Sequence, residues 1–280
     1  MKIVTSVKDM QGWALQARKS GGTVGLVPTM GFLHAGHVSL IREARRRADK
    51  VVLSIFVNPT QFGPDEDLDE YPRDFERDEA LCAAEGVDIV FYPPASDMYA
   101  SDASVFIVEE QLSRGLCGGS RPGHFRGVCT VVAKLFNLVL PDLAVFGRKD
   151  FQQLRILEQM TRDLNFPVEI VSAPIVREED GLAISSRNKY LGPEERRQAL
   201  CLREALDRAE ELFSNGEREA DAIKKEMRHI IGRNTLARID YCQIVEIRQL
   251  QPLSTLNCPA LAALAVYIGQ TRLIDNTVLE

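Results

Sequence analysis

The stretch "TMGFLHAGH", residues 29–37, places two of the chain's four histidines, His34 and His37, three residues apart around a glycine. It follows the apolar run "TVGLVP" at 23–28, so the pattern predicts a strand, a turn and a helix that begins near Ala35. The free N–H groups and the dipole of a helix N-terminus favour an anion. Two imidazoles there can donate hydrogen bonds to a triphosphate while charge moves onto a leaving pyrophosphate.

The glycines of this stretch, and the absence of other nucleotide motifs, bear on the same interpretation. Gly31 and Gly36 permit the backbone to approach a ligand closely. The sequence holds no Gly-Lys dipeptide and therefore no P-loop, and "GGTVG" precedes a predicted strand, whereas a dinucleotide fingerprint follows one. Histidine-based phosphate binding remains, although the residues alone are equally compatible with a capped helix start that carries two surface histidines.

Charged and hydroxyl side chains follow two later predicted strands. In "FGRKDFQQ" the ammonium of Lys149 can offset phosphate charge, and Asp150 can orient it or accept from a ribose hydroxyl. In "ISSRN" at 184–188 two hydroxyl groups and a planar guanidinium can bind phosphate oxygens. Each group is also compatible with a solvated ion pair or an ordinary turn.

Two further loops carry amide and basic groups. "NPTQFG" places Asn58 and Gln61 after the second predicted strand, where their amides suit the hydroxyl and carboxylate oxygens of a substrate, although such residues commonly close turns. "RPGHFRGVCT" adds Arg121, His124 and Arg126, which fit either an anion site or a subunit interface. Because ligands bind at the carboxyl ends of parallel strands, we expect these loops to share one site.

The elements that must position these loops alternate along the first two-thirds of the chain. Runs that are apolar on both faces, as in strands buried between helices, lie at 23–28, 51–57, 87–92, 142–147 and 168–174. Amphipathic stretches lie at 37–48, 73–85, 125–139 and 150–164. This alternation predicts an α/β fold with a doubly wound parallel sheet.

The pattern changes near residue 180. Charged amphipathic helices are predicted at 193–213 and 218–233, and strands at 238–247, 260–269 and 272–280. We therefore predict a larger Rossmann-like domain at 1–180 and a smaller α+β domain at 181–280, which we expect to act as a lid.

Composition limits the classes of partner. The chain has 280 residues, 45% of them hydrophobic, and a net charge of −6, which is ordinary for a globular protein and argues against a nucleic-acid partner. No apolar run approaches the roughly 18 residues of a membrane span, and the N-terminus lacks the apolar core of a signal peptide. The six cysteines are scattered, which argues against a metal site or a disulfide framework. We expect a cytoplasmic protein with no membrane partner.

Seven blocks in order carry a resemblance to a known family. They are "LVPTMGFLHAGH", "VVLSIFVNPTQF", "YPR", "SRPGHFRGVCTVVAKLFNLVLPD", "FGRKDFQQL", "PIVREEDGLAISSRNKYL" and "TRLIDN", and they span about residues 24 to 276. In order and spacing the chain closely resembles the pantothenate synthetase family, the pantoate–β-alanine ligases. The "HxGH" segment is also similar to the signature of a wider nucleotidyltransferase superfamily, and another member acting on a cofactor precursor is the alternative.

The resemblance implies an activity: ATP and (R)-pantoate give pantoyl adenylate and pyrophosphate, and β-alanine then displaces AMP to give pantothenate. It implies a homodimer, Mg²⁺ carried with ATP, no tightly bound cofactor and no protein-bound metal. His34, His37 and Lys149 are the implied catalytic residues. The implied ATP-binding residues are Met30, Gly31, Phe32, Leu33, His34, Ala35, Gly36, His37, Gly147, Arg148, Lys149, Asp150, Val176, Ile184, Ser185, Ser186 and Arg187. Gln61 and Gln153 are implied for pantoate, and Gln61 also for β-alanine.

Overall fold

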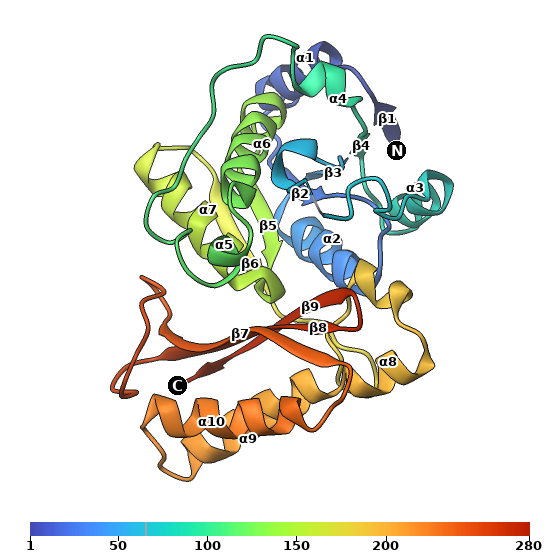
Figure 1. Ribbon diagram of the computed structural model, residues 1–280. Coiled ribbons are helices and arrows are strands. Elements are labelled where there is room, and N and C mark those ends of the chain that lie inside the picture. The colour runs from blue at the N-terminus through green and yellow to red at the C-terminus, as the bar shows by residue number, and fades with distance from the viewer. Residues whose placement is uncertain (65) are drawn as a thin grey trace. The chain divides into compact units, whose positions relative to one another are not determined.

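The computed structural model describes residues 1–64 and 66–280, which form two compact units (Figure 1). The first unit comprises Met1–Glu109, Arg121–Arg148 and Gln153–Pro174, and the second comprises Glu110–Ser120, Lys149–Gln152 and Ile175–Glu280. Two short segments of the second unit, Glu110–Ser120 and Lys149–Gln152, therefore interrupt the first unit along the chain. The long C-terminal segment of the second unit begins at Ile175. The predicted domain border at residue 180 stays a prediction.

The first unit is built on a six-stranded, all-parallel sheet with the strand order β1-β4-β3-β2-β5-β6. Its strands are β1 (Lys2–Val4), β2 (Val24–Thr29), β3 (Lys50–Ile55), β4 (Ile89–Phe91), β5 (Leu143–Gly147) and β6 (Glu169–Ala173). The five predicted strands are all present, and the predicted α/β fold is confirmed. Strand β1 has only three residues and was not predicted from the sequence.

Helices lie between these strands, as the alternation predicts. They are α1 (Val7–Lys19), α2 (Ala35–Arg47), η1 (Pro59–Gln61), α3 (Phe75–Ala84), α4 (Ala95–Met98), α6 (His124–Val139) and α7 (Phe151–Asp163). One buried cluster joins α2 and Cys82 of α3 to inward residues of the sheet such as Val27, Leu53 and Val145. Because β2, β3 and β4 follow one another in one direction and β5 returns to the other side of β2, right-handed crossovers place α6 and α7 on the opposite face from α2 and α3.

The second unit is a three-stranded antiparallel sheet with two helices packed on one face (Figure 1). Its strands are β7 (Ala237–Glu246), β8 (Ala260–Ile268) and β9 (Thr271–Leu279), and its helices are α5 (Leu116–Ser120), α8 (Pro193–Gln198), α9 (Cys201–Ser214) and α10 (Ala220–Gly232), with η3 at Ser186–Tyr190. A further 3₁₀ turn, η2 (Arg148–Asp150), follows β5. All three predicted strands of the smaller domain are present.

The prediction of one helix over 193–213 is wrong, because α8 ends at Gln198 and α9 begins at Cys201. At the break the hydrogen bonds tighten: Leu200 N–H donates to Arg197 O and Leu202 N–H to Ala199 O, both three residues back. The backbone stays right-handed there, so the amphipathic pattern continues across the break and gives no sign of it. No helix among the described residues combines the length and the apolar character needed to cross a membrane.

Candidate active site

Three of the polar loops leave the same edge of the parallel sheet. Thr29 and Ile55, at the ends of β2 and β3, pair in register, and Gly147 ends β5 on the other side of β2. The chain reverses its direction of travel across the sheet between β2 and β5, and ligands in doubly wound sheets bind at such a switch point. The loop after β2 is the "TMGFLHAGH" stretch, so the fold puts the histidines where a ligand site is expected.

His34 is the N-cap of α2, which begins at Ala35 as predicted, and His37 is the third residue of the helix. Their rings stack with centroids 4.0 Å apart, and the backbone N–H of His34 donates to His37 Nδ1 at 3.3 Å. Because Nδ1 accepts this bond, the proton of a neutral His37 ring sits on Nε2, which is then a donor. The first turn of α2 carries no acidic residue, so both ring and helix terminus favour an anion.

Asp78 on α3 holds the turn between β2 and α2, a role that the sequence analysis missed. Its carboxylate accepts from Phe32 N–H and Leu33 N–H, each at 2.7 Å, although the residue is only 1% exposed. Burial raises the pKa of Asp78, and the two backbone hydrogen bonds oppose that shift. Phe32 has a φ of +50°, which is strained for a residue with a side chain, so these bonds hold a conformation that the chain alone would not favour.

The two glycines of the stretch make room for protein atoms. Gly31 has a φ of +85°, and a Cβ there would lie 2.9 Å from Ile55 Cγ2 and 3.1 Å from Asp78 Oδ2. A Cβ at Gly36 would lie 3.0 Å from the His34 ring. Both positions therefore require glycine for packing within the turn, and the predicted close approach of this backbone to a ligand stays a prediction.

Asn58 is a buried residue whose side-chain amide holds the side chain of Gln61 in place. At 1% exposure its Oδ1 accepts from Tyr99 Oη and Thr60 Oγ1, each at 2.9 Å, while its Nδ2 donates to Gly127 O and Gln61 Oε1, each at 3.1 Å. Because these contacts occupy both ends of the amide, we assign Asn58 to positioning, and the expectation that it contacts a substrate is not supported. Gln61 in turn directs its Nε2 toward Met30.

The Gln61 amide lies beside the histidine stretch. Its Nε2 donates to Met30 Sδ at 3.1 Å, and a thioether is a weak acceptor. A carboxylate or hydroxyl oxygen of a bound molecule would be a better partner. The structure therefore brings together Met30 and Gln61, two residues that the sequence analysis placed in the ATP and pantoate sites.

Arg121, His124 and Glu66 form a polar cluster that contacts the backbone carbonyl of Gln61 through His124. His124 Nδ1 lies 2.8 Å from Gln61 O, and its Nε2 lies 3.2 Å from Arg121 Nη1. Because a carbonyl can only accept and a guanidinium can only donate, these contacts select the neutral ring with its proton on Nδ1. Arg121 also donates to both oxygens of Glu66, at 2.7 and 2.5 Å. Burial would raise the pKa of Glu66, but the Arg121 hydrogen bonds and charge outweigh it and hold the pKa below its usual value.

Helix α6 can approach Gln61 only because residue 127 is glycine. A Cβ on Gly127 would lie 2.5 Å from the Thr60 carbonyl carbon and 2.6 Å from Gln61 Cα, both backbone atoms. We expect Gly127→Ala to cost about 1–3 kcal/mol of folding stability and to displace η1. Thermal unfolding measures the first effect, and turnover the second. Gly12→Ala, in α1 with nothing within 4 Å of the added Cβ, is the control, and equal behaviour of the two variants would contradict the prediction.

The second unit holds Lys149 and Asp150 directly after β5. Lys149 Nζ lies 3.5 Å from Asp150 Oδ2, and the two side chains are 22% and 47% exposed. The predicted pairing of these residues is therefore present. An accessible ammonium oriented by a neighbouring carboxylate is suited to binding phosphate.

Val176 and Ile184 lie opposite one another at the base of a turn in the second unit. Ile184 N–H donates to Val176 O at 3.0 Å, Arg177 and Ala183 form an antiparallel bridge, and Gly181 at the tip has a φ of +93°. Ser185 is the N-cap of η3, and its Oγ accepts from Arg187 N–H at 3.3 Å. Ser186, the first residue of η3, is 8% exposed. The Ser185 hydroxyl hydrogen is still available for a donor role.

The predicted site residues divide between the two units. The first contains Met30, Gly31, Phe32, Leu33, His34, Ala35, Gly36, His37, Gln61, Gly147, Arg148 and Gln153, and the second contains Lys149, Asp150, Val176, Ile184, Ser185, Ser186 and Arg187. Arg148 is exposed, with Nε 3.3 Å from Ser172 Oγ, and Gln153 is half-buried in the first turn of α7. No group of three or more His, Cys, Asp or Glu side chains is arranged to hold a metal ion in residues 1–64 and 66–280.

A doubly wound parallel sheet with a histidine-bearing helix N-terminus at its switch point defines an α/β protein built to bind a phosphorylated ligand. The family model described as Pantoate-beta-alanine ligase matches residues 2–278, and this chain belongs to that family of ligases, which form a carbon–nitrogen bond.

The chain is similar to known proteins over its whole length. The pantothenate synthetase of Thermotoga petrophila is 54% identical over 279 residues, covering 100% of both chains. A crystal structure of that enzyme from Thermus thermophilus has a TM-score of 0.94 and 45% identity, covering 99% of both chains. A structure of pantoate-β-alanine ligase from Francisella tularensis, complexed with beta-gamma ATP and β-alanine, has a TM-score of 0.83 and 34% identity, covering 99% of this chain and 97% of that one.

Proposed function

We propose that this chain condenses (R)-pantoate with β-alanine to pantothenate, using ATP and releasing AMP and pyrophosphate. The observation that carries the proposal is the family match over residues 2–278, together with the presence in this chain of the chemical groups the reaction requires. A carboxylate is a poor electrophile, so the acid must be activated before an amine can attack it. The proposed reaction therefore has two steps joined by pantoyl adenylate.

In the first step the pantoate carboxylate oxygen attacks the α-phosphorus of ATP. A new bond to phosphorus forms, and the bond from the α-phosphorus to the bridging oxygen of the β-phosphate breaks, which releases pyrophosphate. No protein nucleophile is needed, because the substrate supplies it. The protein supplies positioning and positive charge. We assign the donor to the departing pyrophosphate to His37 Nε2, with His34 beside it on the phosphates, and further charge neutralisation to Lys149.

In the second step the amine of β-alanine attacks the acyl carbon of the adenylate. The carbon–nitrogen bond forms, the acyl–oxygen bond to AMP breaks, and the amine loses a proton. We assign the binding of pantoate to Gln61 and Gln153, and a contact with β-alanine to Gln61. The support for Gln61 is its Nε2, which faces only a thioether acceptor, Met30 Sδ, in the described contacts.

The remaining residues are assigned to ATP. Met30 to His37, Gly147, Arg148 and Asp150 are proposed for the phosphates and ribose, and Ser185 to Arg187 for phosphate oxygens. The backbone at Val176 and Ile184 is proposed to lie near the adenine. Mg²⁺ would arrive on the ATP phosphates, its usual mode of binding in nucleotide sites, which needs no dedicated cage of protein ligands. We also propose that the protein is a homodimer and acts in the cytoplasm.

Pyrophosphate–ATP isotope exchange tests the first step. With Mg²⁺ and pantoate present and β-alanine omitted, we expect label to move from pyrophosphate into ATP, and we expect the exchange to require pantoate. Addition of β-alanine should then convert the intermediate to pantothenate and AMP. Folded protein that shows no exchange would overturn the proposal and favour a different nucleotidyltransferase of the same superfamily. Circular dichroism on the same sample controls for folding.

A further inference from the structure

The last strand of the second unit, β9, carries two adjacent buried polar residues that the reaction does not use directly. Asp275 is 2% exposed and Asn276 is 6% exposed. Both belong to the "TRLIDN" block, which none of the assigned substrate contacts explains. Buried polar groups cost folding free energy unless they are satisfied, so their partners indicate what they are for.

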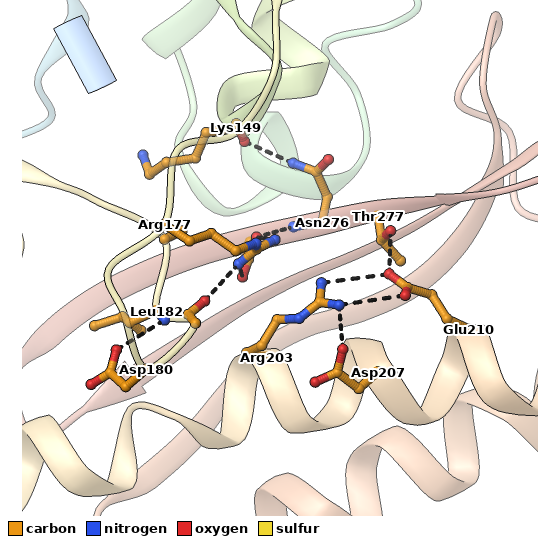
Figure 2. A network of polar contacts seen from close by, with 12 residues as sticks. Lys149, Arg177, Asp180, Leu182, Arg203, Asp207, Glu210, Asn276 and Thr277 are labelled. Atoms are coloured by element: carbon orange, nitrogen blue, oxygen red, sulfur yellow. Dashed lines mark hydrogen bonds and ion pairs between the residues drawn. The ribbon is translucent and has the colours of Figure 1, made fainter. Parts of the chain in front are cut away.

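Asn276 is bonded to the backbone of Lys149. Its Nδ2 donates to Lys149 O at 2.8 Å, a contact between residues 127 positions apart in the chain (Figure 2). The carbonyl belongs to η2, a 3₁₀ turn of only three residues. The bond from a buried strand residue therefore fixes the backbone from which the Lys149 ammonium projects.

Asp275 is bonded to the turn that bears Val176 and Ile184. Its two carboxylate oxygens accept from Arg177 Nη1 at 2.6 Å and Nη2 at 3.0 Å, and Arg177 Nη1 also donates to Gly181 O at 3.0 Å. A bidentate pair fixes the guanidinium in orientation as well as distance. Asp275 Oδ1 further accepts from the backbone N–H of Asn276 at 2.8 Å, which ties the Asp275 carboxylate to the backbone of its neighbour.

The two residues face opposite sides of β9, because side chains alternate along a strand. Leu273 and Leu279 point into the core beneath α9, which places Asp275 and Thr277 on that face and Asn276 on the other. Thr277 Oγ1 donates to Glu210 of α9 at 2.6 Å. Thr277, like Asn276, donates a side-chain hydrogen bond, but its partner is on the core helix α9 and not on the backbone of Lys149. Thr277 therefore serves as the matched control.

We infer that Asn276 is a positioning residue for Lys149, and that the neighbouring Asp275–Arg177 pair holds the Val176–Ile184 turn to the same strand. The inference rests on the proposed function, since it assigns Lys149 a role in adenylation. If Asn276 acts through Lys149, its loss moves the ammonium relative to charge that develops only in the transition state. Turnover should then fall while the KM for ATP changes little.

A double-mutant cycle separates this role from a merely structural one. We expect Asn276→Ala to lower the turnover number of pantoate-dependent exchange about 10- to 100-fold, since a displacement of about 1 Å can cost 10². In a Lys149→Ala background we expect the same substitution to lower turnover less than about twofold, because the group it positions is gone. Asn276→Leu keeps about the side-chain volume without the donor or a charge, and it gives the same cycle if the alanine variant does not fold.

The outcomes distinguish the two proposals. Thr277→Val should lower the thermal midpoint and leave turnover unchanged in both backgrounds. Equal losses from Asn276→Ala in both backgrounds, or no loss in the unsubstituted background, would overturn the inference alone. Absence of pantoate-dependent exchange by the unsubstituted protein would overturn the proposed function and the inference with it.

Discussion

Lys149→Ala should reduce pantoate-dependent pyrophosphate exchange by about 10²–10³, the usual cost of removing one well-placed electrostatic donor from such a site. The Lys149 side chain is 22% exposed, and the neighbouring Asp150 carboxylate orients its ammonium, so the group is accessible to a ligand and still directed. Its charge matters most when negative charge collects on the leaving pyrophosphate. The measurement is the exchange rate at saturating ATP and pantoate, with thermal unfolding to show that the variant is folded.

Lys224→Ala is the matched control for this prediction. Lys224 also lies in the second unit, is 17% exposed and forms an ion pair with Asp221 at 2.7 Å, but it sits on α10. We expect it to leave the exchange rate unchanged. Lys149→Arg keeps the charge and moves its centre, so its exchange rate should lie between that of Lys149→Ala and that of the unsubstituted protein. A Lys149→Ala variant with a nearly normal rate would remove this residue from the proposed mechanism.

The sequence predicted the elements that are set by local patterns. Apolar runs located every strand except β1, whose three residues are too few for a pattern to register, and the polar–apolar period located α2 to within two residues at each end. The histidines could be assigned to a helix N-terminus because the strand, the turn and the helix are contiguous in sequence. Local chemistry was enough there.

Contacts between distant segments could not be predicted from the same patterns. Asp78 bonds Phe32 across 46 residues, and nothing in the sequence of α3 distinguishes this carboxylate from its acidic neighbours. The residue type of Asn58 suits either a substrate contact or a turn, and only the fold shows that its amide is buried and bonded within the protein. Asn276 could be noticed as part of a family block, but its bond to Lys149 O depends on the folding of β9.

The largest effect in the first unit is expected from His37, and the geometry predicts which substitutions keep part of its function. His37→Ala should lower exchange by about 10²–10³, as for loss of any well-placed donor to the leaving group. The ring accepts from His34 N–H through Nδ1, so the hydrogen that we propose is donated to the leaving group is on Nε2, the atom farther from the backbone. The amide of glutamine reaches farther than that of asparagine, by one methylene group.

His37→Gln can therefore offer an N–H near the Nε2 position, whereas His37→Asn offers its amide near the Nδ1 position. We expect glutamine to retain more exchange activity than asparagine, and asparagine to behave like alanine. Both variants keep a polar side chain at the third position of α2, so a difference between them reports on the place of the donor and not on helix stability. If asparagine retained more activity than glutamine, Nδ1 would be the working atom, and the hydrogen bond from His34 would have to break before ATP could react.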